Sequence, residues 1–348
     1  MDAYPTIFDS MTATESLFEA WFTFRRGKCS RVDVRNFSRH AERELFALRR
    51  RLLSGSYRHG SYQTFYIQDP KPRAIRKANV VDRVVHQALH TELTKLYDRR
   101  LLEHVYSGRI GKGVHAGVRA VERMTWKESK NYSRPCFYLK CDIRRFYDSV
   151  DHGILLEIIR RTIKDERMIA VIERVVSSFH TEGAPGKGLP IGNLTSQIFT
   201  NIYLDTFDRF MADRIGGSRY ARFADDFVVI SHRPLTLMSL REEAEDFLAE
   251  RLKLALHPHK VTLAPLHRGL DFLGYVLLPH YRRVRSTTVR RMFRKLSLKL
   301  GEHYAGLVFV DHVQRSLSSY LGVLSHADTY GLSSTLRAHS FIAGERID

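Results

Sequence analysis

Three aspartates, each at the edge of an apolar segment, are the residues of this sequence best suited to chemistry. Asp225 and Asp226 stand side by side, and the apolar residues 227–230 follow them. Asp142 follows a second apolar segment, residues 137–141. Adjacent carboxylates repel each other, and a divalent cation is the natural way to keep both ionised. An isolated Asp-Asp pair also fits a solvated turn, so the third aspartate is what favours a metal site.

The chemistry of three converging carboxylates depends on the metal that they prefer. Mg²⁺ takes hard oxygen ligands and usually shares its coordination shell with the phosphates of a substrate. Three carboxylates at the ends of neighbouring strands would suit two Mg²⁺ ions roughly 3.5–4 Å apart, with Mn²⁺ as an alternative. The sequence therefore predicts a two-metal site for phosphate chemistry, with Asp142, Asp225 and Asp226 as its ligands.

Predicted strands must bring these aspartates together. Residues 136–143 are apolar and aromatic and predict a strand with Asp142 near its end, and residues 218–231 predict two strands joined by a tight acidic turn. A loop at 183–192 leads into a predicted helix at 196–211, whose apolar face comprises Phe199, Ile202, Tyr203, Phe207 and Phe210. Further helices are expected at 31–53, 80–97 and 235–256, a strand at 62–68, and basic helices after Tyr281. This irregular alternation indicates an α+β fold rather than a doubly wound sheet.

The charge balance indicates a polyanionic partner. The chain has 348 residues, with 56 Lys and Arg against 38 Asp and Glu, for a net charge of +18. Phosphate backbones are the commonest partner of so basic a protein, although solubility alone or anionic lipid would also account for the charge. No run of eighteen apolar residues predicts a membrane span. The three cysteines lack zinc-ligand spacing and residues 1–10 do not form a secretory signal, so a cytoplasmic protein is expected.

Four successive motifs resemble those of reverse transcriptases. They are Asp142 with Phe146-Tyr147-Asp148, the loop at 188–197, Phe223-Ala224-Asp225-Asp226, and Phe272-Leu273-Gly274-Tyr275. The resemblance runs from about residue 71 to about residue 327. It implies a right-hand polymerase whose palm is an antiparallel sheet packed on helices. The expected domains are an N-terminal region with fingers at 1–135, a palm at 136–280 with a fingers insertion at about 160–185, and a helical thumb at 281–348.

The resemblance also implies roles for single residues. Asp142, Asp225 and Asp226 match a metal-binding triad, in which one ion activates a primer 3′-hydroxyl and the other stabilises the leaving pyrophosphate. Ile143 matches a position that offers its main-chain carbonyl to a metal ion. Tyr147 matches the aromatic residue that excludes a ribose hydroxyl, although a role in the core also fits it. The positions matching nucleotide contacts are Lys71, Arg73, Arg144, Phe146, Tyr147, Ile191, Gly192, Gln197 and Lys260.

For some of these residues the resemblance also implies a chemical role. Lys71 and Arg73 resemble the fingers residues that hold the incoming triphosphate, and Lys260 matches a lysine that can protonate the leaving pyrophosphate. The motif at 272–275 (Phe272, Leu273, Gly274 and Tyr275) resembles the primer grip. The segment after Tyr281 resembles the first thumb helix, with a basic face that would follow a nucleic-acid backbone or would simply be solvated. The backbone-contacting residues of that helix would be Arg290, Arg291, Arg294 and Lys295.

The loop motif distinguishes among reverse transcriptases. Pro190-Ile191-Gly192 followed by Ser196-Gln197 is similar to the enzymes of diversity-generating retroelements, in which an RNA template is copied with errors at adenines. A phage-defence or retron-like enzyme that uses a dedicated non-coding RNA is the alternative within the family, and a non-catalytic RNA-binding protein is the alternative outside it. The partners implied are template RNA, primer or cDNA and deoxynucleoside triphosphates. The resemblance also allows a small basic accessory protein.

Overall fold

The computed structural model describes residues 6–68 and 72–340, so the predicted nucleotide contact Lys71 lies outside the described residues. The chain forms two compact units, each assembled from separate segments. The first unit comprises Met1–Gly113, Lys140–Phe227 and Ser239–Val261, and the second comprises Val114–Leu139, Val228–Met238 and Thr262–Asp348. Both β3 (Phe137–Asp142) and β5 (Asp226–Ser231) contribute residues to each unit. The fold class is mixed α and β, as expected.

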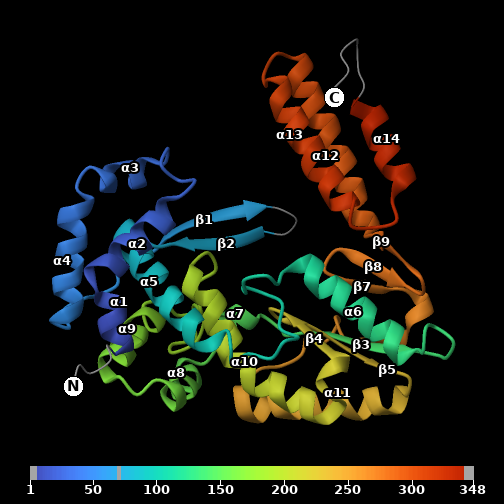
Figure 1. Cartoon of the computed structure of the whole chain (residues 1–348), viewed down its shortest axis with the longest axis horizontal. Coiled ribbons are helices and arrows are strands. Elements are labelled where there is room, and N and C mark those ends of the chain that lie inside the picture. The colour runs from blue at the N-terminus through green and yellow to red at the C-terminus, as the bar shows by residue number, and fades with distance from the viewer. Residues whose placement is uncertain (1–5, 69–71, 341–348) are drawn as a thin grey trace. The chain divides into compact units, whose positions relative to one another are not determined.

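The N-terminal part of the first unit consists of helices around a hairpin. The helices are α1 (Ile7–Thr12), α2 (Thr14–Arg25), α3 (Val32–Ser38), α4 (Ala41–Leu53) and α5 (Val80–Tyr97). The hairpin is formed by β1 (Gln63–Gln68) and β2 (Pro72–Lys77), which pair in antiparallel register with Phe65 opposite Ile75. Helix α5 packs against α2 (Figure 1), and its buried stripe of Val84, Val85, Ala88, Leu89 and Leu93 explains this placement. The predictions at 80–97 and 62–68 are confirmed, the second to within one residue.

The single helix expected at 31–53 is wrong, because the chain breaks between α3 and α4. The break falls at Arg39 and His40, where His40 has φ −131° and ψ 21°. It lets Phe37 turn onto Trp21, with ring centroids 4.6 Å apart, while Leu45, Leu48 and Leu52 of α4 remain buried. The local periodicity continues across the break, and only the tertiary contact to α2 shows that the helix stops.

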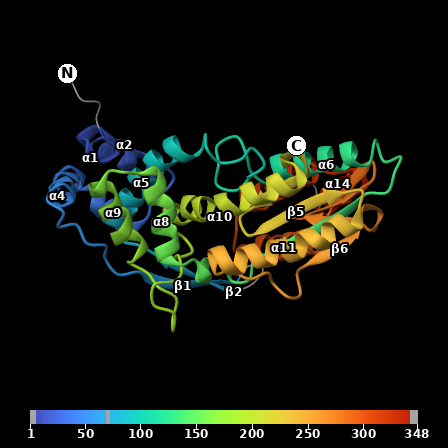
Figure 2. The same cartoon turned by 90° about the horizontal axis from the view of Figure 1, so that it is seen from below.

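The centre of the first unit is the long helix α10 (Leu194–Ile215), which is buried on nearly all sides. It packs against α5 and α8 (His152–Thr162), and α8 packs against α9 (Glu166–Val176), as Figure 2 shows. The apolar residues of α10 face several sides, as expected of a helix in a core, whereas Arg209, Asp213 and Arg214 near its C-terminal end are exposed. The prediction at 196–211 is confirmed, and the helix extends beyond it at both ends. Its Phe210 ring stacks on Phe247 with centroids 4.5 Å apart.

The aspartates lie on a four-stranded sheet whose strand order is β4-β5-β3-β6. Strand β4 (Tyr220–Phe223) and β5 form the predicted hairpin, and β6 (Thr262–Pro265) lies at the other edge. The strand predicted at 136–143 is β3, within one residue at each end. Helix α11 (Pro234–Leu252) ends four residues before the predicted limit of 256, and the chain then forms an isolated bridge between Ile143 and Leu256.

The second unit contains α6 (Val114–Glu128), a three-stranded sheet and three C-terminal helices. The sheet is formed by β7 (Leu270–Phe272), β8 (Tyr275–Leu278) and β9 (Tyr281–Val284), all antiparallel. The predicted basic helices after Tyr281 therefore begin one strand later than expected. They are α12 (Ser286–Tyr304), α13 (Val310–Leu324) and α14 (Tyr330–Ser340), which pack together (Figure 1). No helix in the described part of the chain combines the length and apolar character needed to cross a bilayer.

Candidate active site

The hairpin between β4 and β5 and the end of β3 bring the three aspartates together within the first unit. Asp142 is the last residue of β3, Asp225 is in the turn, and Asp226 begins β5, the neighbour of β3. The main-chain N–H of Ile143 donates to the carbonyl oxygen of Asp225 over 3.1 Å. This bond ties the residue after Asp142 directly to the hairpin turn. The two strands thus place the lone aspartate beside the pair, as the sequence predicted.

A second segment approaches the same point from residues 255–260. The N–H of Arg144 donates to the carbonyl of Ala255 over 2.8 Å, and the N–H of His257 donates to the carbonyl of Asp142 over 2.8 Å. The Lys260 ammonium then reaches the Asp142 carboxylate, with Nζ and Oδ2 2.8 Å apart. Lys260 and Asp142, which were predicted to have separate roles, are therefore in contact, and a cation already lies against one of the three carboxylates.

Burial and repulsion from neighbouring carboxylates raise the pKa of both aspartates of the pair. Burial, followed by the charge of Asp142, raises the pKa of Asp225. Burial, reinforced by the charges of Asp225 and Asp142 and opposed by Lys140, raises the pKa of Asp226 to about 6 from an ordinary value of 3.8. The three carboxylates are thus close enough to act on one another. Such strain between like charges is what a bound cation would relieve.

The donor set fits divalent metal ions. Three carboxylates supply hard anionic oxygens, and two of them are destabilised as charged groups where they stand. Within the described residues, no three His, Cys, Asp or Glu side chains are already arranged as a metal cluster. Instead the Asp142 carboxylate is held by Lys260. Metal binding would therefore require some rearrangement of these side chains.

Protonation of Asp226 is expected to compete with metal binding. Its raised pKa means that the folded protein binds this proton more tightly than the unfolded chain does. Ionisation of Asp226 therefore lowers the stability of the metal-free protein above about pH 6, and this loss disappears as the pH falls toward 4. Between pH 7.5 and 5.5, we expect the affinity for Mn²⁺, measured by calorimetric titration, to weaken by about fourfold or more. An affinity independent of pH in this window would contradict the expected competition.

A buried ion pair beneath the hairpin was not predicted. Arg222 of β4 is fully buried and donates to both oxygens of Asp208 on α10, each over 2.6 Å. Its remaining nitrogen donates to the carbonyl of Ala224 over 2.9 Å and to Asn201 over 3.3 Å. Tyr220 also donates to Asp208, over 2.7 Å. Two sequence features could have predicted this ion pair: a charged residue inside an apolar strand, and an aspartate on the buried face of a helix. Each would be buried, and a buried charge needs a partner.

This ion pair supports a strained turn next to the carboxylates. Ala224 has φ +55°, a left-handed conformation that is unfavourable for a residue with a side chain. The bond from Arg222 to the Ala224 carbonyl fixes the peptide that leads into Asp225. Arg222 and Asp208 are therefore positioning residues for the aspartate pair.

The predicted nucleotide-contacting loop lies against the β1–β2 hairpin. The N–H of Arg76 donates to the carbonyl of Ile191 over 2.9 Å, and the Asn193 amide donates to the carbonyl of Arg76 over 3.1 Å. Gly192 has φ +114°, and a Cβ there would lie 2.7 Å from a methyl carbon of Ile75. The loop therefore needs glycine both for its backbone conformation and for its contact with β2.

The other predicted nucleotide contacts divide into exposed and buried residues. Phe146 is buried and Tyr147 is half-buried in α7 (Phe146–Ser149), and burial raises the pKa of Tyr147. Arg73, Arg144 and Gln197 are exposed. The charge of Arg73 acts on both Asp225 and Tyr147. The structure thus gathers β2, Tyr147 and the carboxylates around one region of the first unit.

The predicted primer-grip and backbone residues belong to the second unit. Phe272 ends β7 and Tyr275 begins β8, and both are buried. Leu273 and Gly274 form the turn between them, with φ +51° and +90°. On α12, Met292, Leu296 and Leu300 face inward. The four basic residues all have some exposure, Arg290 and Arg294 more than Arg291 and Lys295.

Comparison with known proteins supports the resemblance to reverse transcriptases that the sequence motifs indicate. Residues 67–277 match the family model described as reverse transcriptase (RNA-dependent DNA polymerase). Protein YkfC of Escherichia coli (strain K12) is 25% identical over 273 residues, which cover 68% of this chain and 71% of YkfC. The group II intron-encoded protein LtrA of Lactococcus lactis subsp. cremoris is 22% identical over 241 residues, 64% of this chain but only 39% of LtrA.

The fold has solved counterparts among telomerases. The structure of telomerase from Candida albicans in complex with a fragment of telomeric RNA matches with a TM-score of 0.52 at 11% identity. The match covers 82% of this chain and 60% of the telomerase chain. At this identity the likeness concerns the fold alone, and it agrees with the expected right-hand polymerase architecture.

Proposed function

Because the chain belongs to the reverse transcriptase family, we propose that it is an RNA-directed DNA polymerase whose metal ligands are Asp142, Asp225 and Asp226. The observation that carries this proposal is the meeting of the three carboxylates at the ends of β3 and β5, where burial and the neighbouring carboxylates raise the pKa of both Asp225 and Asp226. They lie inside the region that matches the family model. A protein that only binds RNA would have no need to maintain three mutually repelling, partly buried acids.

Reverse transcriptases use divalent metal ions, and we propose two Mg²⁺ ions, with Mn²⁺ as a substitute, at these carboxylates and the main-chain carbonyl of Ile143. When bound, the ions would supply activation of a primer 3′-hydroxyl and charge stabilisation at the leaving pyrophosphate. The chain's own groups orient and neutralise the substrate. Arg73 would contact the triphosphate, and Lys260, already at Asp142, would be placed to give a proton to pyrophosphate.

The remaining contacts follow from the same proposal. Tyr147 would lie against the sugar and exclude a ribose hydroxyl, and Gly192 would let the loop backbone approach the nascent base pair. Phe272 to Tyr275 would hold the primer, and the basic face of α12 would follow the duplex backbone. The partition into fingers, palm and thumb at residues 1–135, 136–280 and 281–348 remains a proposal. So do the partners: template RNA, primer or cDNA, deoxynucleotides and a small basic accessory protein.

Within the family, we propose error-prone copying of a template RNA, as in a diversity-generating retroelement. The feature that favours it is Ile191, whose side chain offers shape but no hydrogen bond to the nascent pair. A phage-defence or retron-like role, with a dedicated non-coding RNA, is the alternative. An adjacent template and variable repeat in the genome would favour the first role.

Installing a polar side chain at residue 191 tests the proposed cause of error. Ile191→Gln is expected to lower misincorporation at template adenines several-fold, because a contact worth about 1 kcal/mol is added for correctly aligned pairs. Sequencing of the cDNA made by both proteins gives the error rates. Unchanged misincorporation at adenines would exclude Ile191 as the source of the errors.

The direct test of the proposed activity is primer extension on an RNA template with labelled deoxynucleotides. Product should form with Mg²⁺ or Mn²⁺ and should be absent with EDTA. An inactive wild-type protein, even with its cognate RNA and accessory protein present, would support a non-catalytic RNA-binding role instead.

A further inference from the structure

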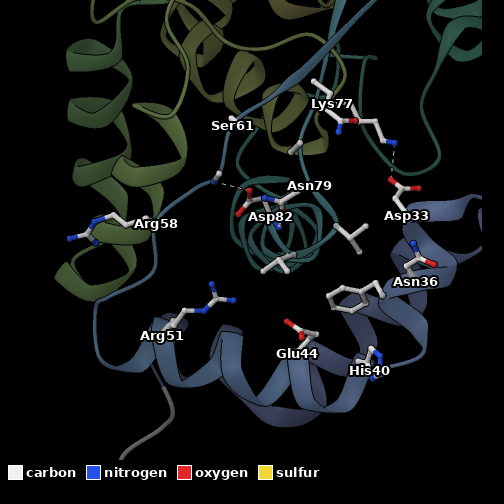
Figure 3. Close-up of a pocket in the computed structure, with 16 residues that line it drawn as sticks. Asp33, Asn36, His40, Glu44, Arg51, Arg58, Ser61, Lys77, Asn79 and Asp82 are labelled. Atoms are coloured by element: carbon white, nitrogen blue, oxygen red, sulfur yellow. Dashed lines mark hydrogen bonds and ion pairs between the residues drawn. The ribbon is translucent and has the colours of Figure 1, made fainter.

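A cavity of about 610 Å³ lies in the first unit between α3, α4, the segment before β1 and the start of α5 (Figure 3). Its volume is in the range of small-molecule sites. Opposite charges are balanced around it, because the lining contains Asp33, Glu44 and Asp82 together with Arg51, Arg58 and Lys77. Such a lining suits a neutral group with both donors and acceptors better than a bare anion.

Most of these charges are already satisfied by the protein. Asp82 accepts a hydrogen bond from the Tyr57 hydroxyl over 2.9 Å. Asp33 pairs with Lys77 over 2.7 Å. Arg58 donates to nearby main-chain carbonyls over 2.9 and 3.2 Å. These groups shape the wall of the cavity, and the capacity to bind a ligand lies with the two that remain.

The two remaining groups are Glu44 and Arg51, which lie two turns apart on α4. Figure 3 shows both side chains extending from α4 into the cavity. The Nε atom of Arg51 is buried and has no hydrogen-bond partner in the described structure, although buried polar atoms normally have one. Among the described residues, the Glu44 carboxylate pairs only with the exposed Arg43, over 3.1 Å through one of its two oxygens. The cavity thus presents an unused donor and an unused acceptor, two helical turns apart on the same helix.

Guanine is the base whose edges match this pair. Its N1–H and N2–H donors suit a carboxylate, and its adjacent O6 and N7 acceptors suit a guanidinium. Phe37, Val80 and Val81 add an aromatic and apolar wall for the base. We propose that this cavity binds an unpaired guanine of an RNA strand.

A neighbouring basic cavity could hold the RNA nucleotides next to the bound guanine. It measures about 290 Å³ and shares Lys77 with the first cavity. Its lining has no Asp or Glu and contains Lys28, Arg31, Lys77 and Arg83. Lys77 and Arg83 pair with Asp33, which leaves Lys28 and Arg31 as the cations not held by that carboxylate. Phenylalanines 24 and 65 lie among them. Cations interleaved with aromatic rings suit the phosphates and bases of a single strand, so the adjoining nucleotides would lie here.

The test is a binding measurement that needs no catalysis, since the inference rests on the proposed function only in taking RNA as the ligand. Fluorescence anisotropy would compare oligouridines that carry one central G, A, C or U, in EDTA and without deoxynucleotides. The G-containing strand is expected to bind about 10-fold more tightly than the other three. Glu44→Gln, which has nearly the same size, and Arg51→Met should each remove this preference.

Matched controls come from the same helix. Glu42 and Arg50 are exposed on α4 and do not line the cavity, so Glu42→Gln and Arg50→Met should keep the preference for G. Circular dichroism would show that each variant is folded. Equal binding of all four strands by the wild type, or a preference for G that survives Glu44→Gln, would overturn the inference. Failure of primer extension would leave this result unaffected, so the two proposals can fail separately.

Discussion

Replacing Asp225 with asparagine is expected to reduce primer extension on an RNA template by about 10³-fold, equal to about 4 kcal/mol of transition-state stabilisation. The amide keeps the size of the side chain and leaves the main-chain bond from Ile143 to Asp225 in place. It removes the anionic oxygen that a metal ion would require. Single-turnover extension of a labelled primer, with wild type and variant at equal concentration, measures the loss.

Asp148 supplies the matched control for this substitution. It lies in the same region, on α7, but is exposed. Asp148→Asn is expected to retain activity within a few-fold of wild type. RNA binding in EDTA should be the same for all three proteins. If Asp225→Asn kept more than a tenth of the wild-type rate, the role of Asp225 as a metal ligand would be excluded.

Breaking the buried pair of Arg222 and Asp208 is expected to have the second large effect, on stability. Either Arg222→Met or Asp208→Leu leaves one charge in a fully buried site, and such changes lower the free energy of unfolding by about 3–5 kcal/mol. That is a large part of the 5–15 kcal/mol that holds a typical domain folded. Urea unfolding followed by circular dichroism would measure the difference. A loss below about 1 kcal/mol would show that the pair is not essential to the fold.

The double variant separates the structural role of the pair from its positioning role. Replacing both charges with apolar residues is expected to recover most of the stability, because no lone charge remains. It would still lack the hydrogen bond that Arg222 makes to Ala224, next to Asp225. We therefore expect a folded protein whose primer extension is about 10-fold or more below wild type. A folded double variant with full activity would limit Arg222 to a role in stability.

The elements around the site could be predicted because their patterns are local. Helix α5 and the β4–β5 hairpin matched the expected ranges closely, since buried stripes and an acidic turn between apolar strands are readable from spacing alone. The break between α3 and α4 could not be predicted in this way. It depends on the packing of Phe37 against Trp21, a contact between separate helices that leaves no mark on either one's own periodicity.

In the site, too, some residues could be predicted from the local sequence, whereas others depend on tertiary packing. The three aspartates could be predicted from their residue type and their order in the sequence. The ion pair of Arg222 and Asp208 could not, because it forms only when β4 packs on α10. The cavity around Glu44 and Arg51 is assembled from four segments, none of which has a motif of its own. The sequence indicates such features only through charged residues inside apolar segments. These residues predict that a charge is buried, but they do not show which residue is its partner.

The most direct test of the central claim is anomalous diffraction from crystals of the protein grown with a template–primer, a deoxynucleotide and Mn²⁺. We predict two manganese peaks bound by the carboxylates of Asp142, Asp225 and Asp226, beside the triphosphate. Manganese found elsewhere, with none at these carboxylates, would contradict the assignment of a two-metal polymerase site.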